Sequence, residues 1–116
     1  MGYRSEVGFA CDPIVKEIIK TVSEWNKDLR QLINDGDDLT HDKEQGRWRW
    51  DWVKWYEGYP EIDTMERIMQ FVENAEMQGL SYDSFGFIRI GEDYGDIEQK
   101  GAPFEFDLYV NRSVEI

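Results

Sequence analysis

The sequence predicts an α+β domain of two layers, a four-stranded and mainly antiparallel sheet with two helices on one face, in the order β-α-β-α-β-β. Three observations support this prediction. Apolar and polar residues alternate in four segments, as they do in strands with one buried face. Two longer segments repeat apolar residues at helical spacing. The 116 residues, of which 41% are hydrophobic, fit a single domain over residues 1–116.

The first strand is predicted over residues 3–11, where alternation continues as far as Cys11. Asp12 and Pro13 then form a helix start, an N-cap acid followed by proline at the first helical position. Apolar residues recur at helical spacing to Ile33, so we expect one long helix over residues 13–34. Its predicted core stripe is Ile14, Val15, Ile18, Ile19, Val22, Trp25, Leu29, Leu32 and Ile33.

Residues 35–46 are polar and rich in aspartate, and they predict a mobile acidic loop. A strand with alternating tryptophans follows over residues 47–56. Its aromatic face changes side before Trp55, which a bulge or a sharp twist near Val53 would explain. The second helix is predicted over residues 60–78, because proline suits its first turn and an apolar stripe follows.

The last two strands are predicted over residues 82–90 and 104–110, each from alternating apolar side chains. The connection between them, residues 91–102, is longer than most hairpin loops. Since no helix separates these strands, we expect them to pair antiparallel.

Charge is the strongest global feature of the chain, which has 13 basic and 25 acidic residues and a net charge of −12. Residues 1–54 hold 9 basic and 11 acidic side chains, whereas residues 55–116 hold 4 and 14. Such a surface repels nucleic acid and anionic lipid, so direct binding to either is not expected. Two interpretations remain: an acidic face shaped for a basic groove, or a solvated surface that maintains solubility.

Cysteine and histidine each occur once, as Cys11 and His41, which excludes intrachain disulfides and Cys/His zinc sites. The sequence therefore predicts no catalytic residues, no metal site and no cofactor. No apolar run is long enough for a membrane span, and the first residues do not form a signal peptide. We expect a cytoplasmic location.

An acidic loop over residues 91–98 offers the clearest candidate for a partner-binding surface, together with the aspartates that follow the first helix. Its other interpretations are an exposed hairpin loop and a Mg²⁺ or Ca²⁺ site, although the spacing of a calcium loop is missing. A metal-dependent phosphoesterase is the corresponding enzymatic alternative. The predicted partner-binding residues are Glu92, Asp93, Tyr94, Asp96, Glu98, Asp35, Asp37 and Asp38.

Aromatic residues and arginines form a second candidate site, a pocket that would stack a small molecule or nucleotide and pair with its phosphate. In the alternatives, these rings pack beneath the helices, or they form an exposed hot spot at a protein interface or between copies in a homo-oligomer. The residues of this candidate are Trp48, Trp50, Trp52, Arg47, Arg49 and Arg89.

Four segments resemble small, largely uncharacterised acidic proteins encoded by tailed bacteriophages: MGYRSEV (residues 1–7), KWYEGYPE (54–61), FIRIGEDY (87–94) and DLYVNR (107–112). The resemblance implies a viral protein that works in the cytoplasm of its host cell. It further implies an anti-defence or other inhibitory role, in which the acidic protein docks on a basic surface of a host protein, partly as a DNA mimic. The main alternative is a protein that binds and sequesters a small molecule or nucleotide.

Overall fold

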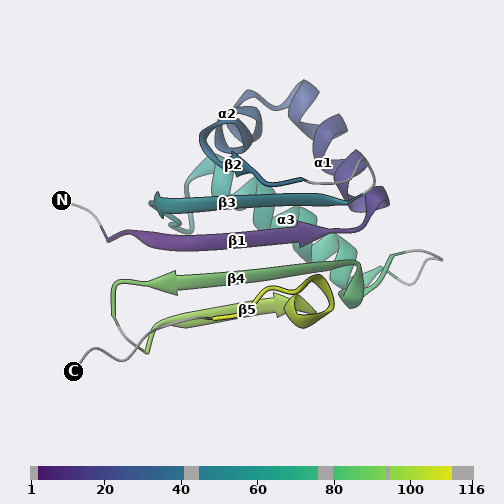
Figure 1. Cartoon of the computed structure of the whole chain (residues 1–116). Helices are drawn as coiled ribbons and strands as arrows, with labels where there is room; N and C mark the ends of the chain where they lie inside the picture. Colours follow the sequence, from purple (N-terminus) through teal and green to yellow (C-terminus); the bar gives the residue numbers. More distant parts are fainter. Residues whose placement is uncertain (1–2, 41–44, 76–79, 94, 111–116) are drawn as a thin grey trace.

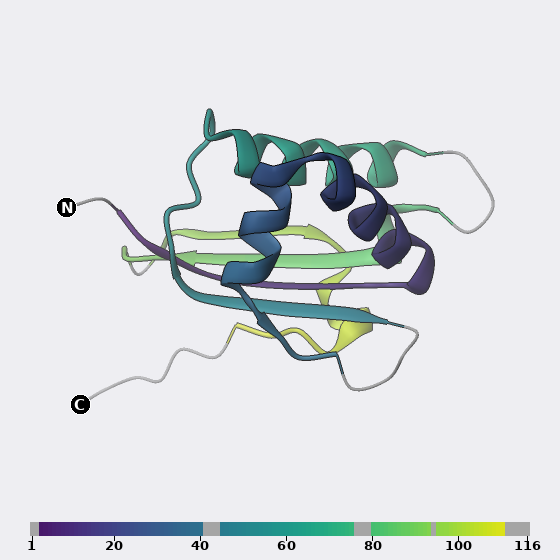
Figure 2. The ribbon, with the colours of Figure 1, turned by 90° about the horizontal axis from the view of Figure 1, so that it is seen from above.

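The computed structural model describes residues 3–40, 45–75, 80–93 and 95–110 of the chain. In this part of the chain, an antiparallel sheet carries the α-helices on one face, which confirms the predicted α+β class (Figures 1 and 2). The elements, including two short 3₁₀ helices η1 and η2, are β1 (Ser5–Cys11), α1 (Pro13–Trp25), α2 (Lys27–Asp35), β2 (Asp37–Asp38), β3 (Gly46–Val53), α3 (Pro60–Asn74), η1 (Tyr82–Ser84), β4 (Phe85–Gly91), β5 (Ile97–Gly101) and η2 (Pro103–Phe106).

The sheet contains five strands in the described residues, in the spatial order β2-β3-β1-β4-β5, instead of the predicted four. Ser5 at the start of β1 lies opposite Val53 of β3 and Gly91 of β4. Val7 lies opposite Trp50, so a step of two residues along β1, from Val7 to Ser5, corresponds to a step of three along β3. The register between the two strands therefore shifts between Val7 and Ser5. This shift confirms the predicted bulge near Val53.

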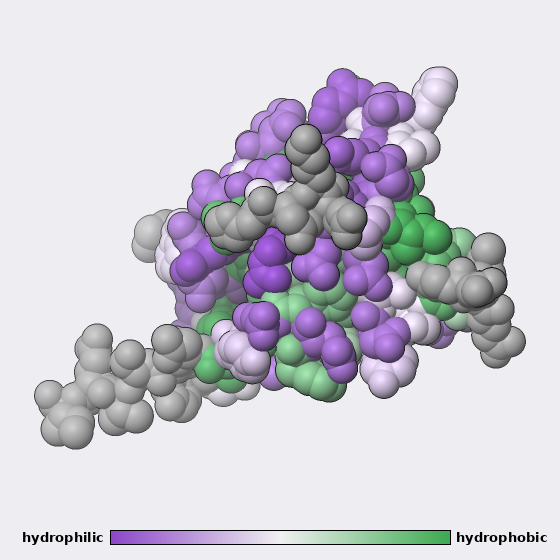
Figure 3. Space-filling model, turned by 45° about the vertical axis from the view of Figure 1, so that its right-hand side comes forward, coloured by the Kyte–Doolittle hydropathy of each residue, from purple (hydrophilic) through white to green (hydrophobic). Residues whose placement is uncertain are grey.

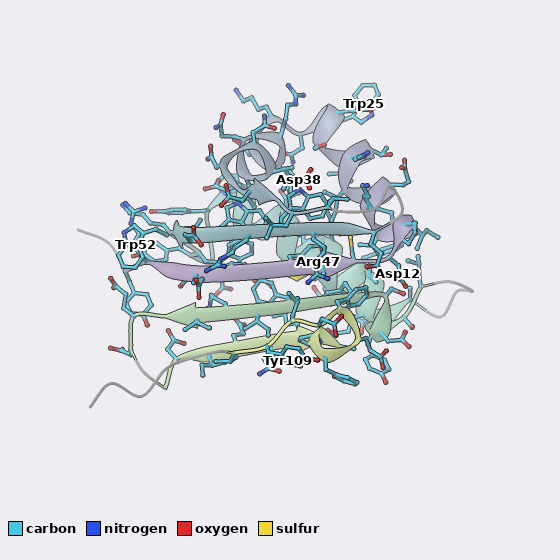
Figure 4. The ribbon with its side chains drawn as sticks, in the orientation of Figure 1. Asp12, Trp25, Asp38, Arg47, Trp52 and Tyr109 are labelled. Carbon is cyan, nitrogen blue, oxygen red and sulfur yellow. The ribbon has the colours of Figure 1, made fainter. Side chains whose placement is uncertain are left out.

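The single helix predicted over residues 13–34 is in fact two helices, α1 and α2, that meet at Asn26. Asn26 Oδ1 accepts the N–H of Leu29 at 3.0 Å and so caps the start of α2. The backbone N–H of Asn26 donates to the carbonyl of Val22 at the end of α1. Because the chain turns here, Trp25 is 86% exposed and projects from the helix layer instead of joining the core (Figure 4).

The strand predicted over residues 104–110 does not form. The short helix η2 occupies the start of this segment and lies on the face of the sheet opposite the α-helices (Figure 2). Arg47, from that face of β3, donates to the carbonyl of Phe106 at 2.6 Å. Instead, the strand that follows β4 in the chain and pairs with it is β5, which lies inside the predicted connection 91–102.

Other boundaries also differ from the prediction. The loop predicted over residues 35–46 is partly structured, since Asp35 ends α2 and the next residues form β2, while residues 41–44 lie outside the described residues. The second predicted helix begins at Pro60 and extends to Asn74 in the described part; residues 76–79 lie outside it. A two-residue strand has no periodicity, so β2 could not be recognised in the sequence.

Aromatic rings form the centre of the core between the sheet and the helices. The ring centroids of Phe9 and Trp48 lie 6.0 Å apart, and Trp55 lies 5.4 Å from Phe87 and 5.7 Å from Trp50. These three tryptophans are at most 8% exposed, so most of the tryptophan cluster packs beneath the helices. Among the described helices, none is both long and apolar enough to cross a membrane.

Candidate functional site

Two grooves open at the end of the sheet where β1 begins and β3 ends. The first has a volume of about 850 Å³ and runs between α3 and the ends of β4 and β5; we call it the salt-bridge groove. The second has a volume of about 600 Å³ and lies between α2, the end of β3 and the start of α3; we call it the Trp52 groove. Nine carboxylates and five basic side chains line the two grooves. Together with the turn between β4 and β5, they form what we call the acidic end.

Arg89 organises the salt-bridge groove from the end of β4. Its Nη2 and Nη1 donate to the two carboxylate oxygens of Asp96 at 2.8 and 3.2 Å, and its Nε donates to Glu98 at 3.0 Å. Nη1 also donates to the hydroxyl of Ser5 at 3.1 Å. The Asp96 hydrogen bond, followed by the one from Glu98, raises the pKa of Arg89 despite its partial burial. Four hydrogen bonds within the chain therefore hold the guanidinium, which has five N–H donors.

Tyr3 connects this network to the turn. Its hydroxyl donates to Asp96 Oδ2 at 2.6 Å and accepts the backbone N–H of Asp93 at 3.0 Å. The hydrogen bond to Asp96 raises the pKa of Tyr3. Tyr3 thus anchors the residues before β1 to the turn that closes the β4 and β5 hairpin.

Lys100 forms the second cationic centre of the groove, on β5. Its ammonium contacts Glu66 of α3, lies 3.8 Å from Glu98, and sits 5.7 Å from the centre of the Phe87 ring. Glu66 also accepts the indole N–H of Trp55 at 3.0 Å. These contacts hold α3 against the sheet, so two of the three cations that line the groove, Arg89 and Lys100, have partners within the chain.

The predicted partner-binding residues of the described part separate into four groups. Glu92 and Asp93 are exposed on the turn, whereas Asp96 and Glu98 point into the salt-bridge groove as partners of Arg89. Asp35 lines the Trp52 groove. The other two aspartates form β2 at the opposite edge of the sheet from β5. Tyr94 lies outside the described residues.

Asp38 on β2 has a local environment of its own (Figure 4). Its carboxylate accepts the backbone N–H of Thr40 at 2.9 Å. Hydrogen bonds from Thr40, and more weakly the charges of Lys16 and Lys20 on α1, lower the pKa of Asp38. This aspartate therefore belongs to a cationic neighbourhood that is distinct from the acidic end.

The structure does not assemble the predicted pocket of tryptophans and arginines. Trp48 and Trp50 are only 5% and 3% exposed beneath the helices. Arg47 and Arg49 extend from the opposite face of β3, where Arg49 pairs with Glu6 at 2.6 Å and also with Asp51. Arg89 is paired in the salt-bridge groove, so only Trp52 remains as an accessible ring from this set.

Trp52 lies within the register shift of β3, between Trp50 and Val53, at the end of the sheet (Figure 4), and is 64% exposed. Tyr59, from the segment before α3, lines the same groove and is 38% exposed. The groove also contains the buried apolar residues Leu32, Trp50 and Ile62. Its charged residues are four carboxylates and two bases: Asp28, Asp35, Asp51, Glu61, Arg4 and Lys54.

Sequence reasoning missed Asp28, Tyr59 and Glu61 as site residues. Asp28 and Glu61 belong to the first turns of α2 and α3, where acidic residues are common for helix stability alone. Asn26 was the available signal for Asp28, because a helix that starts after this asparagine places the aspartate in its first turn. No local pattern links Tyr59 to Trp52, since their presence in one groove depends on how β3 and α3 are placed.

The surface on another side of the molecule is predominantly hydrophilic, with hydrophobic residues visible in smaller areas between polar ones (Figure 3). Among the described residues, no group of three or more His, Cys, Asp or Glu side chains is placed to hold a metal ion. Burial raises the pKa of the Cys11 thiol to about 12, so this thiol is not a nucleophile near neutral pH.

No protein-family model, curated protein or solved structure matches this chain.

Proposed function

We propose that the chain is a non-enzymatic binding protein that docks its acidic end onto a basic surface of another protein and thereby inhibits it. The observation that carries this proposal is the combination of an exposed tryptophan with a carboxylate-rich groove. Trp52 is 64% exposed in a groove lined by four carboxylates and two bases. Tryptophan is enriched among the residues that dominate binding energy at interfaces, and complementary charge steers association.

The charge distribution supports the same proposal. The Trp52 groove and the turn carry carboxylates, among them Asp28, Glu61 and Glu92, that have no ion pair in the described part of the chain. Carboxylates without an internal cation keep their charge available to a partner. By contrast, Asp96 and Glu98 hold the scaffold together, so they support the docking surface instead of forming it.

The resemblance to acidic phage proteins suggests the kind of partner, a host or host-defence protein in the cytoplasm. Partial mimicry of nucleic acid is the mode of inhibition we propose, because carboxylates compete for the Lys and Arg side chains that otherwise hold phosphates. The 13 basic residues of the chain restrict this mimicry to one end of the molecule. Competition by duplex DNA for the same partner tests this mode.

A pair of charge-matched variants tests the proposed function. The quadruple variant Asp28→Asn, Glu57→Gln, Glu61→Gln, Glu92→Gln removes four negative charges from the acidic end. The control replaces four carboxylates elsewhere, by Glu17→Gln, Glu24→Gln, Glu73→Gln and Glu105→Gln. Each variant is immobilised, exposed to a bacterial lysate at about 0.1 M salt and washed at rising salt, and the retained proteins are identified by mass spectrometry.

We expect the wild type and the control to retain the same basic protein, and the acidic-end variant to lose it. The losses of Asp28 and Glu61 cost about 0.3–1 kcal/mol each in helix stability, which a melting curve monitors. Equal retention by the acidic-end variant would contradict the proposed surface. Equal loss from the control would show that net charge, and not this end of the molecule, causes retention.

A further inference from the structure

Resting on the proposed function, we infer that the Trp52 groove receives an arginine side chain of the partner protein. An arginine combines an apolar stem with a planar cation that has five N–H donors. The groove offers a matching surface for each of these two parts. The inference therefore names the recognition element within the larger acidic end.

The interior of the groove suits the stem of the arginine. Leu32, Trp50 and Ile62 line it, and each is at most 3% exposed. Trp50 has already satisfied its indole N–H, which donates to the carbonyl of Leu32 at 2.8 Å. These three residues therefore form a closed apolar floor, and the accessible apolar surface of the groove comes from Trp52, Val53 and Tyr59 above it. The transfer of methylene groups from water to such a surface is favourable.

The rim suits the guanidinium. Asp28 and Glu61 have no hydrogen bond or ion pair from their side chains in the described part of the chain. Asp35 accepts only a neutral amide, from Gln31 at 2.8 Å, whereas Asp51 is paired with Arg49. Three carboxylates of the rim are therefore available to a new cation.

The two bases of the groove do not neutralise these carboxylates. Arg4 donates to the backbone carbonyl of Trp52 at 3.4 Å, and Lys54 forms no ion pair with the described residues. The four carboxylates outnumber the two bases, so the groove attracts a cation and repels a phosphate. Charge complementarity thus favours a cationic occupant.

The exposed ring favours arginine over lysine as that occupant. A guanidinium stacks on an aromatic face more readily than an ammonium does, and cation–π contacts are strongest with tryptophan. Trp52 and Tyr59 supply two accessible rings beside the rim. Arginine is also the residue that can share its fork of donors among several carboxylates.

Nuclear magnetic resonance tests this inference on the intact, ¹⁵N-labelled protein. The probe is acetyl-Gly-Arg-Gly-amide, and the control peptide replaces arginine by citrulline, which is neutral and nearly isosteric. The Trp52 indole N–H signal is assigned by its disappearance in Trp52→Phe. We expect the arginine peptide to shift this signal with saturation in the millimolar range, and the citrulline peptide to shift it far less.

Protein variants locate the interaction. Asp28→Asn with Glu61→Gln is expected to weaken arginine-peptide binding roughly threefold to tenfold, because each exposed ion pair makes a modest contribution. The control pair Glu17→Gln with Glu24→Gln removes the same charge from α1 and is expected to bind like the wild type. Spectra of each variant without peptide show whether its fold is retained.

Several outcomes would overturn the inference: no shift of the Trp52 signal, an equal shift by the citrulline peptide, or unchanged affinity in the Asp28 and Glu61 variant. Equal affinity for a lysine peptide would overturn the choice of arginine. These outcomes leave the proposed function standing if the lysate protein is still lost from the acidic-end variant. Retention of that protein by the variant would instead refute the proposed function.

Discussion

Arg89 offsets the charge of two carboxylates at the acidic end, and its guanidinium is well shielded from solvent. Its side chain is only 16% exposed, while those of its partners Asp96 and Glu98 are 33% and 40% exposed. Screening by water is weak at such a site, so removal of the cation leaves two carboxylates close together with the Tyr3 hydroxyl and the more distant Lys100 as weaker partners. The network therefore stabilises the hairpin of β4 and β5 and the position of Tyr3.

We predict that Arg89→Met lowers the free energy of unfolding by about 2–3 kcal/mol, less than for a fully buried pair because both carboxylates are partly exposed. Arg49→Met is the matched control: Arg49 forms the same kinds of ion pairs but is 52% exposed, and the expected loss is below about 1 kcal/mol. Urea unfolding of the two variants measures the difference. Equal losses would show that burial of Arg89 has no energetic consequence.

Cys11 is fully buried at the end of β1, and burial raises the pKa of its thiol to about 12. The thiol pKa in the unfolded chain is about 8.5, well below the pKa in the folded protein. The thiol therefore contributes its full stabilisation below about pH 8.5, and this stabilisation is lost as the pH rises toward 12. We predict that Ellman's reagent at pH 8 modifies Cys11 only as fast as the protein opens. Between pH 9 and about 11, Cys11→Ala should lose less stability than the wild type does. Rapid modification of the folded protein would contradict the prediction.

Among the elements, the segment after β5 departs most from its sequence pattern. Phe104, Phe106 and Leu108 alternate with polar residues, as in a strand with one buried face. In the structure, however, Phe104 and Phe106 both belong to η2, and Phe104 is 65% exposed whereas Phe106 is 4% exposed. The small residues Gly8 and Gly86 leave room for this segment on the second face of the sheet. Alternation cannot distinguish a strand from a segment that packs on a strand, so the prediction failed here.

The close approach of η2 to the sheet makes a specific prediction for Gly86. A Cβ there would lie 2.6 Å from Pro103 Cα, a backbone atom that cannot rotate away. Gly86→Ala should therefore lower the free energy of unfolding by about 1–3 kcal/mol. Gly95→Ala is the control, since a Cβ at Gly95 meets nothing within 4 Å, and its effect should stay within about 1 kcal/mol. Denaturant unfolding measures both; an equal effect would contradict the packing of η2 on β4.

The helices show a different limit of sequence patterns. α1 and α2 bury one stripe of apolar residues that remains in phase across Asn26, so the periodicity predicts one helix over residues 13–34. The break depends on the Asn26 side chain, which can occupy an exposed helical position as readily as a cap. By contrast, Pro60 specified the start of α3 correctly, because a proline is compatible with the first turn but not with the interior of a helix.

In the molecule as a whole, the net charge of −12 dominates the long-range electrostatics. The ion pairs of the described residues involve only a minority of the 25 acidic side chains. Compacting such a chain brings like charges together, and this repulsion opposes folding. The charge that forms the proposed docking surface thus also lowers the stability of the protein at low ionic strength.

We predict that the melting temperature rises between 0.01 and 0.15 M NaCl, since the Debye length falls from about 30 to about 8 Å over this range. The acidic-end variant, with four fewer negative charges, should show a smaller rise than the wild type. Calorimetry or fluorescence melting at each salt concentration measures both curves. A melting temperature that falls with salt would show that attraction within the ion pairs outweighs the overall repulsion.

The α+β class, β1, the start of α1 and of α3, the bulge in β3 and the acidic excess all follow from composition and local periodicity, because these depend on neighbours in the chain. The roles of individual site residues do not. Trp50 and Trp52 occupy equivalent places in the alternating pattern, yet they are 3% and 64% exposed. The acidic loop likewise divides into exposed Glu92 and the paired Asp96. Such differences arise because burial and charge pairing are set by residues far away in the sequence, which only the packing of strands and helices brings within a few ångströms.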